Sequence, residues 1–308
     1  MACAARATGW QDKMPEPLVT VVMPVYNAGP YLRQAVLSIV RQSFGDWELL
    51  VIDDASTDGA VGSIADIDDT RIRVVANARN LGLAATLNVG IDLARGEFIA
   101  RMDQDDIAYP ERLERQLALL RADPALDLVA VRCLTISPSG EALGLLPWAQ
   151  THEALAARPW LGFYLPHPTW MARTAWYRRH RYHLPEIHLS EDQELLLRSH
   201  AESRFATVPE VLFAYRIRER KDWRRQARSR RAQLKMQLDH FMRAKQLGNA
   251  ALSLLAFCAR MAMDFANTLA SGGGRLGPHR RMPLEDAELA RWRAVRDGLA
   301  QAAGPGRG

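Results

Sequence analysis

The chain has 308 residues, of which 48% are hydrophobic and 24% are charged, and its formal net charge is +5. This composition is typical of a globular protein with one large α/β domain or two domains, and it excludes a disordered chain, a collagen and a minimal peptide scaffold. The charge is unevenly distributed, because residues 216–231 hold nine basic and two acidic residues and the rest of the chain is net −2. A local basic segment suggests an anionic partner, such as a phosphate, a nucleic acid or a membrane.

The cysteines and the N-terminus indicate the compartment. Cys3, Cys133 and Cys258 are far apart in the sequence, which supports neither a disulfide framework nor a zinc ribbon. Residues 1–13 lack the apolar core of a secretory signal, and no stretch reaches about 18 uninterrupted apolar residues. We therefore expect a cytoplasmic chain in a reducing compartment, without a transmembrane span.

Short β-rich runs alternate with helical ones between residues 18 and 133, which is typical of βαβ units and a largely parallel sheet. The pattern predicts strands at residues 18–24, 47–52, 71–76, 97–102 and 127–133, and helices at 30–40 and 83–94. Further along we expect a turn at 137–140, a helix at 190–201, and a strand, a turn and a strand within 205–216. The predicted fold class is α/β.

The C-terminal part is predicted to be helical. A basic helix follows residue 218, and a second helix covers residues 248–270. Five polar residues of the second helix fall within about a 60° arc at 100° per residue, and most of its remaining surface is apolar. They are Asn249, Ser253, Arg260, Asp264 and Asn267. The glycines at 272–274 end this helix, and we expect a small helix with loose ends in the tail to residue 308.

Acidic and aromatic residues follow the predicted strands, at the edge where an open α/β sheet binds its ligands. Tyr26 and Asn27 follow the first strand, acidic residues lie within 53–58 after the second, and three aspartates lie within 103–106 after the fourth. Neither a dinucleotide-binding nor a P-loop glycine motif is present. One cluster alone would be weak support, because turns are rich in Asp for conformational reasons. Two clusters and an aromatic ring able to lie on a base favour nucleotide binding.

The clustered carboxylates also predict a metal. Bare carboxylates repel a diphosphate, so they can hold one only through a divalent cation. Mg²⁺ or Mn²⁺, which prefer hard oxygen ligands, suit this role. We therefore expect one of these two ions as the cofactor.

Several motifs occur in a fixed order along the chain. They begin with Met23-Pro-Val-Tyr-Asn27, Val51-Ile-Asp-Asp-Ala-Ser-Thr-Asp58, Asn80-Leu-Gly-Leu-Ala84 and Ala100-Arg-Met-Asp-Gln-Asp-Asp106. They continue with Pro110-Glu-Arg-Leu113, His167-Pro-Thr169, Ser190-Glu-Asp-Gln-Glu-Leu195 and Val208-Pro-Glu-Val-Leu212. This series resembles family 2 glycosyltransferases, which are inverting, nucleotide-sugar-dependent enzymes of the GT-A fold. The resemblance covers residues 18–216.

The resemblance implies a GT-A fold, in which a Rossmann-like nucleotide-sugar-binding sheet has helices on both faces, with a C-terminal helical extension here. It divides the chain into four parts. Residues 1–17 are an N-terminal tail, 18–133 the nucleotide-sugar-binding half, 134–217 the half that binds the acceptor and supplies the catalytic base, and 218–308 the basic and amphipathic helical region.

The resemblance also assigns roles at the strand ends. It implies that Pro24, Tyr26 and Asn27 line the nucleoside pocket and that Asp54 accepts a hydrogen bond from the base or the ribose. Asp105 would be the direct metal ligand, and Asp103 would face the ribose or the outer shell of the metal. For Asp106 a role at the metal and a role as a helix cap or loop carboxylate both stay open.

Sugar transfer requires a base that takes the proton of the acceptor hydroxyl. Glu191-Asp192 resembles the Glu-Asp base motif of the family, which makes Asp192 the base and Glu191 a candidate contact to the acceptor or the metal. Taken without the family, residues 190–193 are an ordinary capped helix start with acids in the first turn. His167 is a further candidate contact to the acceptor or the metal, and the alternative for it is a packed loop residue.

Together these features predict a metal-dependent, inverting glycosyltransferase that moves one sugar from a nucleotide-diphosphate sugar, with a UDP-sugar favoured. The acceptor is a saccharide or a polyprenyl-linked saccharide in the synthesis of a cell-surface polysaccharide or glycolipid. The Gln-x-x-Arg-Trp motif of processive family members is missing. The alternative is a nucleotidyltransferase or a non-catalytic nucleotide-sugar binder on the same fold. A basic glycine-rich loop is missing after the first strand, and Asp105 and Asp192 are both present, which disfavours each of these.

The basic segment has three interpretations. It can be a solvated helix face, a nucleic-acid patch or a contact with an anionic membrane. Only Trp223 lies among the basic residues, and a nucleic-acid-binding motif is missing, so we expect no nucleic acid partner. A membrane surface could bind residues 216–231 electrostatically and residues 248–270 through their apolar face. That would place the protein peripherally on the inner face of the cell membrane.

Overall fold

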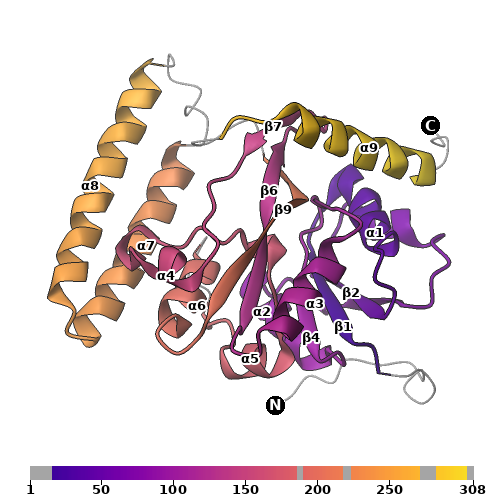
Figure 1. The fold of residues 1–308 in the computed structure, drawn as a ribbon, viewed down its shortest axis with the longest axis horizontal. Coiled ribbons are helices and arrows are strands. Elements are labelled where there is room, and N and C mark those ends of the chain that lie inside the picture. Colours follow the sequence, from indigo (N-terminus) through magenta and orange to yellow (C-terminus); the bar gives the residue numbers. More distant parts are fainter. Residues whose placement is uncertain (1–15, 186–189, 218–222, 271–281, 304–308) are drawn as a thin grey trace.

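The computed structural model describes residues 16–185, 190–217, 223–270 and 282–303 (Figure 1). The strands are β1 Val19–Val25, β2 Trp47–Asp53, β3 Ile72–Ala76, β4 Phe98–Arg101, β5 Ile107–Ala108, β6 Leu128–Ile136, β7 Ala142–Leu145, β8 Met171–Arg173 and β9 Phe205–Arg216. The helices are α1 Leu32–Val40, α2 Leu83–Leu93, α3 Arg112–Ala122, α4 His152–Ala156, α5 Thr174–Arg179, α6 Glu191–Ser199, α7 Trp223–Arg243, α8 Leu247–Ala270 and α9 Asp286–Ala303.

One twisted sheet runs through the molecule in the order β3-β2-β1-β4-β8-β6-β9-β5, with β7 paired to β6. The first four strands of this order are parallel to one another, as the alternating pattern of residues 18–102 predicts. Strand β8 is antiparallel to both β4 and β6, and so it joins the parallel unit to the second half of the sheet. The predicted boundary at residue 133 falls inside β6, and the sheet continues across it.

Helices cover both faces of the sheet, as expected for the GT-A fold. One apolar core packs α1, α3 and α9 against one face, with Leu32, Leu113 and Trp292 fully or almost fully buried. A second core packs α2, α5, α6 and α7 against the other, around residues such as Trp176 and Phe241. The central strand β1 is buried along its whole length between the two cores, whereas the edge strand β3 is partly exposed.

Two expectations for the later chain are wrong. Residues 205–216 form the single strand β9 in place of two strands and a turn. Its register against β6 shifts after Val208, so Pro209 and Glu210 form a bulge. Pro209 cannot donate a ladder hydrogen bond, and a bulge accommodates it without ending the strand.

The C-terminal tail is also more ordered than predicted. Helix α9 has 18 residues and lies back across α1 (Figure 1). The Trp292 side chain is 1% exposed, its ring stacks on Tyr109 at 6.2 Å between centroids, and its Nε1 donates to the Gly140 carbonyl at 3.1 Å. Burial of this one large aromatic side chain fastens α9 to the residues around Tyr109 and Gly140.

Helices α7 and α8 form a hairpin at one end of the molecule, with α8 on the outside (Figure 1). The polar stripe predicted on α8 faces inward. Ser253 is buried, Asp264 forms an ion pair with Arg230 of α7, and the Arg260 Nη2 donates to the Leu161 carbonyl at 2.8 Å. The apolar surface of α8 is therefore the side that faces away from the protein.

The basic segment is not one surface patch. Arg216 is 8% exposed and lies at the end of β9, and Arg230 is paired with Asp264. Arg228 and Arg231 are exposed on α7. Residues 218–222, which carry part of the predicted charge, lie outside the described residues.

Candidate active site

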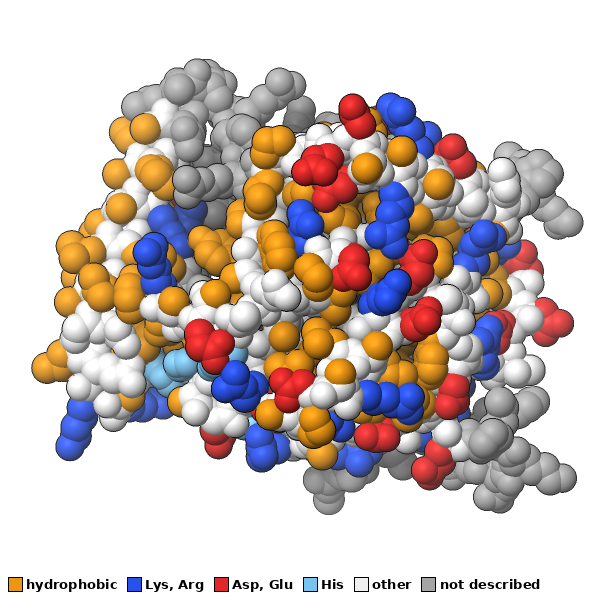
Figure 2. Space-filling view, viewed as in Figure 1, with side chains coloured by type: hydrophobic (Ala, Val, Ile, Leu, Met, Phe, Trp, Pro, Cys, Tyr) orange, Lys and Arg blue, Asp and Glu red, His pale blue; other side chains and the backbone are white. Residues whose placement is uncertain are grey.

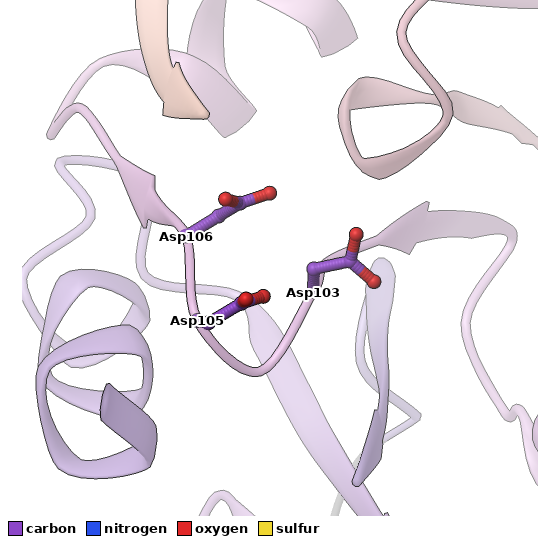
Figure 3. Close-up of side chains that lie close together, drawn as sticks. All are labelled: Asp103, Asp105 and Asp106. Carbon is purple, nitrogen blue, oxygen red and sulfur yellow. The ribbon is translucent and has the colours of Figure 1, made fainter. Parts of the chain in front are cut away.

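Three carboxylates meet on the loop that joins β4 to β5. One oxygen from each of Asp103, Asp105 and Asp106 lies within 4.8 Å of the others, and Figure 3 shows all three side chains along the same bend of the chain. The loop follows the carboxyl end of β4, which lies beside β1 in the parallel part of the sheet. This is the edge where the sequence predicts a ligand.

Asp106 is the most buried of the three, with 1% of its surface exposed. Its Oδ1 accepts a hydrogen bond from the Arg216 backbone N at 2.7 Å, and its Oδ2 is buried without a partner. Burial raises the pKa of Asp106, and the charges of Asp103 and Asp105 raise it further. The unpartnered Oδ2 of Asp106 belongs to a cluster with two further carboxylates. This arrangement fits a divalent cation, which would give the buried oxygen a partner and offset the repulsion among the three carboxylates. Asp106 precedes β5, so it is not a helix cap.

Arg216 holds this loop in place. Its Nε donates to the Asp105 carbonyl at 2.8 Å, and its Nη1 donates to the Ser137 and Pro138 carbonyls at 3.1 and 2.9 Å. The guanidinium also lies over the Tyr31 ring, 4.4 Å from its centroid. In the sequence Arg216 begins the basic segment and is also the last residue of the stretch that resembles the family, and this role was not predicted for it.

The loops after β1 and β2 are tied to each other and to the acidic loop. The Gln104 side chain makes two hydrogen bonds with the Tyr26 backbone. Its Oε1 accepts from the Tyr26 N at 2.6 Å, and its Nε2 donates to the Tyr26 carbonyl at 3.1 Å. The Asn27 backbone N donates to Ser56 Oγ at 3.1 Å, and Asn27 Oδ1 accepts from the Thr57 N at 2.9 Å. These bonds leave the Tyr26 ring 49% exposed beside the acidic loop.

Pro24 and Asp54 lie deeper than the roles implied for them suggest. Pro24 is a buried residue within β1. Asp54 is 3% exposed and accepts three hydrogen bonds: from Asn77 Nδ2 at 2.8 Å, from Leu81 N at 2.8 Å and from Gly82 N at 3.0 Å. Asp54 thus fixes the start of α2 to the end of β2. Contact of either residue with a nucleoside stays a prediction.

A buried arginine adjoins the first carboxylate. Arg101 is 3% exposed, and its Nη2 pairs with Asp103 Oδ1 at 2.7 Å, while its Nε and Nη1 are buried without hydrogen-bond partners. Burial disfavours the charged guanidinium, but the negative charge of Asp103 and the groups Tyr182 and Glu191 outweigh this and raise the pKa of Arg101. Arg101 therefore carries a permanent positive charge between the acidic loop and the start of α6.

His167 lies in the same neighbourhood. Its Nε2 is 2.6 Å from the Tyr182 hydroxyl and its Nδ1 is 3.5 Å from Glu191 Oε1. Burial and, to a lesser extent, the charge of Arg101 lower the pKa of His167 to about 3, although Asp192 and Asp103 act in the opposite direction. The imidazole is therefore neutral at pH 7. Because the Glu191 carboxylate can only accept, the tautomer that suits both contacts carries its proton on Nδ1 and accepts from the Tyr182 hydroxyl at Nε2.

Asp192 stands in the first turn of α6. Burial raises its pKa above the ordinary 3.8 and Glu191 raises it further, while His167 and the hydrogen bonds of Gln193 oppose the rise. A raised pKa makes a carboxylate a stronger base. The Ser190 side chain makes no capping hydrogen bond, so the acids of this turn are not part of an ordinary capping box.

Gln193 links Asp192 to the C-terminal hairpin. Its Oε1 accepts from the Phe163 N at 2.8 Å, and its Nε2 lies 3.3 Å from Asp192 Oδ2. The preceding turn is held from outside, because Gln237 Nε2 of α7 donates to the Trp160 carbonyl at 3.1 Å and Arg260 of α8 donates to Leu161. The hairpin therefore supports the turn whose Phe163 contacts Gln193 beside Asp192.

Comparison with known proteins identifies the family. Residues 20–180, more than half of the chain, match the sequence model of glycosyl transferase family 2. The chain belongs to this family. An uncharacterized glycosyltransferase of Methanocaldococcus jannaschii is 30% identical over 217 residues, which are 68% of this chain and 74% of that protein. The family resemblance of the motifs is confirmed.

Other relatives match over shorter stretches. The Escherichia coli UDP-Glc:α-D-GlcNAc-diphosphoundecaprenol β-1,3-glucosyltransferase WfgD is 36% identical over 107 residues, which are 35% of this chain and 42% of that enzyme. Three further bacterial relatives are matched over 46%, 41% and 33% of their own length. The chain thus spans less than half of these relatives.

Solved structures confirm the GT-A fold. S. aureus TarS 1-349 in complex with UDP-GlcNAc is 18% identical, with a TM-score of 0.60 over 93% of this chain and 81% of that one. The mannosyltransferase PcManGT of Pyrobaculum calidifontis, in complex with GDP-Man and Mn²⁺, is 20% identical, with a TM-score of 0.55 over 94% and 85%. At such identities the likeness concerns the fold alone.

Replacement of Asp54 separates its structural bonds from a role in nucleotide binding. In Asp54→Asn an amide NH₂ would replace one of the oxygens that now face N–H donors. We expect the free energy of unfolding, measured by urea denaturation without ligand, to fall by about 1–3 kcal/mol. Asp68→Asn, at an exposed carboxylate in the same N-terminal part of the chain, should leave the free energy of unfolding unchanged. Unchanged stability of Asp54→Asn with weaker donor binding would instead assign Asp54 to the nucleoside.

Proposed function

We propose that this chain is a metal-dependent, inverting glycosyltransferase that moves one sugar from a nucleotide-diphosphate sugar to a saccharide or lipid-linked acceptor. The observation that carries the proposal is the cluster of Asp103, Asp105 and Asp106 close to the Glu191-Asp192 pair. The pKa of His167 responds to Asp103 and to Asp192 alike, so both groups lie within electrostatic reach of one side chain. A donor site and a base in one neighbourhood are what a direct sugar transfer requires.

The carboxylates of the acidic loop would hold Mg²⁺ or Mn²⁺. Asp105 is the proposed direct ligand, the unpartnered Oδ2 of Asp106 offers a second oxygen, and Asp103 serves the metal or the ribose. When bound, the metal neutralises the charge that develops on the leaving diphosphate. Arg101 pairs with Asp103 at 2.7 Å and so holds its carboxylate in place. The Mn²⁺ complex of PcManGT supports a metal in such a fold.

The base in this proposal is Asp192. It takes the proton of the acceptor hydroxyl while that oxygen attacks the anomeric carbon and the bond to the diphosphate breaks. Glu191 and the neutral His167 stand beside it, where the Nδ1 proton of His167 faces the Glu191 carboxylate. His167 thereby orients Glu191 for a contact with the acceptor without adding a positive charge that would weaken the base.

The donor is proposed to be a UDP-sugar, with Tyr26 and Asn27 at the nucleoside. The exposed Tyr26 ring, whose backbone Gln104 fixes, is placed to lie on a base next to the acidic loop. Two similar proteins act on or bind a UDP-sugar, namely the glucosyltransferase WfgD and TarS in complex with UDP-GlcNAc. The acceptor of WfgD is a saccharide on diphosphoundecaprenol, which supports a lipid-linked acceptor and a role in cell-surface polysaccharide or glycolipid synthesis.

Replacement of the base should stop the reaction without removing the donor. In Asp192→Asn the shape of the side chain is kept and its basicity is lost, so kcat should fall by about 100- to 10,000-fold. Release of nucleoside diphosphate measures turnover, and thermal shift measures donor binding, which should be retained. The matched control is Glu194→Gln on the same helix, where the carboxylate pairs with Arg198. Full turnover by Asp192→Asn would remove Asp192 as the base.

Donor binding should depend on metal. At a concentration of about 100 times Kd, the correct donor should stabilise the protein by about 2.7 kcal/mol. A thermal-shift screen of UDP-glucose, UDP-GlcNAc and GDP-mannose, with Mn²⁺ and with a chelator, measures this. Asp105→Asn should lose the metal-dependent part of the shift. Equal protection in the chelator would contradict a metal-dependent site.

The product should have the inverted anomeric configuration. One base opposite one leaving group favours a single in-line displacement, which reverses the configuration at the sugar carbon. NMR of the product made from an α-linked donor should therefore show a β-linkage. A retained α-linkage would contradict the assignment of Asp192 as the base in a single displacement.

A further inference from the structure

Helix α8 exposes a face that carries no polar side chain. Every exposed residue from 247 to 266, a stretch described in full, is apolar or glycine. These residues, called here the outer face of α8, are Leu247, Gly248, Ala251, Leu252, Leu254, Leu255, Cys258, Ala259, Ala262, Met263, Phe265 and Ala266. Leu255 and Phe265 are 66% and 67% exposed. Figure 2 shows hydrophobic side chains along this edge of the molecule.

The amphipathic character of α8 is reversed relative to a helix that faces water. Such a helix buries its apolar stripe and exposes its polar one. In α8 the buried Ser253, the Asp264 ion pair and the Arg260 hydrogen bond all lie on the inward side. Contiguous apolar surface of this kind marks a contact with another apolar phase.

The charge of the α7–α8 hairpin favours an anionic partner for the outer face of α8. Residues 223–266 hold nine basic and two acidic residues, net +7, and the rest of the chain is therefore net −2. Arg243 and Lys245 are exposed at the end of the outer face, in the turn between α7 and α8. A second copy of this hairpin would offer no complementary charge, because its described exposed charges are five bases and one acid. An anionic lipid surface offers an apolar phase and the opposite charge together.

We propose that the outer face of α8 docks on an anionic lipid surface, with α8 lying parallel to that surface. Residues 247–266 are long and apolar enough to span a bilayer, with a mean hydropathy of 1.2. A span is disfavoured because α7 packs along α8, and its exposed Arg228, Arg231 and Lys235 would enter the hydrocarbon with it. Parallel docking leaves these charges among the lipid headgroups and the water.

Docking would hold the active site close to the lipid. Arg260 of α8 and Gln237 of α7 bind the turn at Trp160 and Leu161, and the next residues of that turn contact Gln193 beside Asp192. The membrane contact is therefore joined to the base through a short series of hydrogen bonds. The inference adds a location to the proposed transfer reaction and does not depend on it.

Flotation of the full chain with vesicles tests the proposal. The variant Leu255→Glu/Phe265→Glu places two carboxylates on the outer face without touching the inward side. Wild type should float with phosphatidylcholine–phosphatidylglycerol vesicles and less with phosphatidylcholine alone. The variant's partition coefficient should be lower by at least about tenfold, since two large apolar contacts are lost. Val74→Glu, at a 49% exposed valine on β3, is the matched control and should float as wild type does.

Three results would overturn the proposal. Wild type that stays with the unbound fraction shows that lipid does not cover the outer face. Equal flotation of wild type and the double variant shows that lipid binds elsewhere. A wild-type dimer that the double variant splits into monomers, in sedimentation velocity without lipid, shows that a second copy covers this face. Donor protection measured on the same samples is independent of these outcomes, so loss of the proposed catalytic function would be recognised separately.

Discussion

The hydrogen bonds of Arg216 are the interaction on which the arrangement of the site depends. This arginine ends β9, yet it donates to the Asp105 carbonyl and, through its backbone N, to Asp106. It thereby fastens a loop from the parallel half of the sheet to the last strand of the other half. Three carboxylates that repel one another would otherwise spread apart, and the buried guanidinium both positions their backbone and offsets part of their charge.

The site as a whole balances opposite charges at short range. Arg101 and Arg216 flank the acidic loop, and His167 stays neutral between Arg101 and the acids of α6. A protonated imidazole there would lower the basicity of Asp192, whereas the neutral ring can orient Glu191. The C-terminal hairpin belongs to the same system, because it supports the turn that carries Phe163 against Gln193. Its inward polar stripe thus contacts the rest of the protein, and its apolar face is exposed.

Much of the fold could be predicted because its signals are local. Short apolar runs ended by turns predict the four parallel strands, and the motif at 100–106 predicts the acidic loop. Arg216 could not be recognised in the same way, since it stands at the start of a basic segment and its hydrogen-bond partners lie about 80 and 110 residues earlier in the chain. The bulge at Pro209 and the burial of Trp292 were missed for a similar reason. The bulge depends on how β9 pairs with β6, and the burial of Trp292 depends on how α9 packs against the rest of the protein. Neither feature produces a local pattern in the sequence.

The sequence by itself determined the family, the α/β order of elements, the positions of the acidic clusters and the existence of one polar stripe on α8. These features depend on residue type and on the periods of strand and helix, which are read along the chain. Only the tertiary structure decided which way the stripe faces, which carboxylate oxygen lacks a partner and which arginine belongs to the site. Each of these depends on contacts between residues far apart in the sequence, and the same helical period is compatible with a polar stripe turned inward or outward.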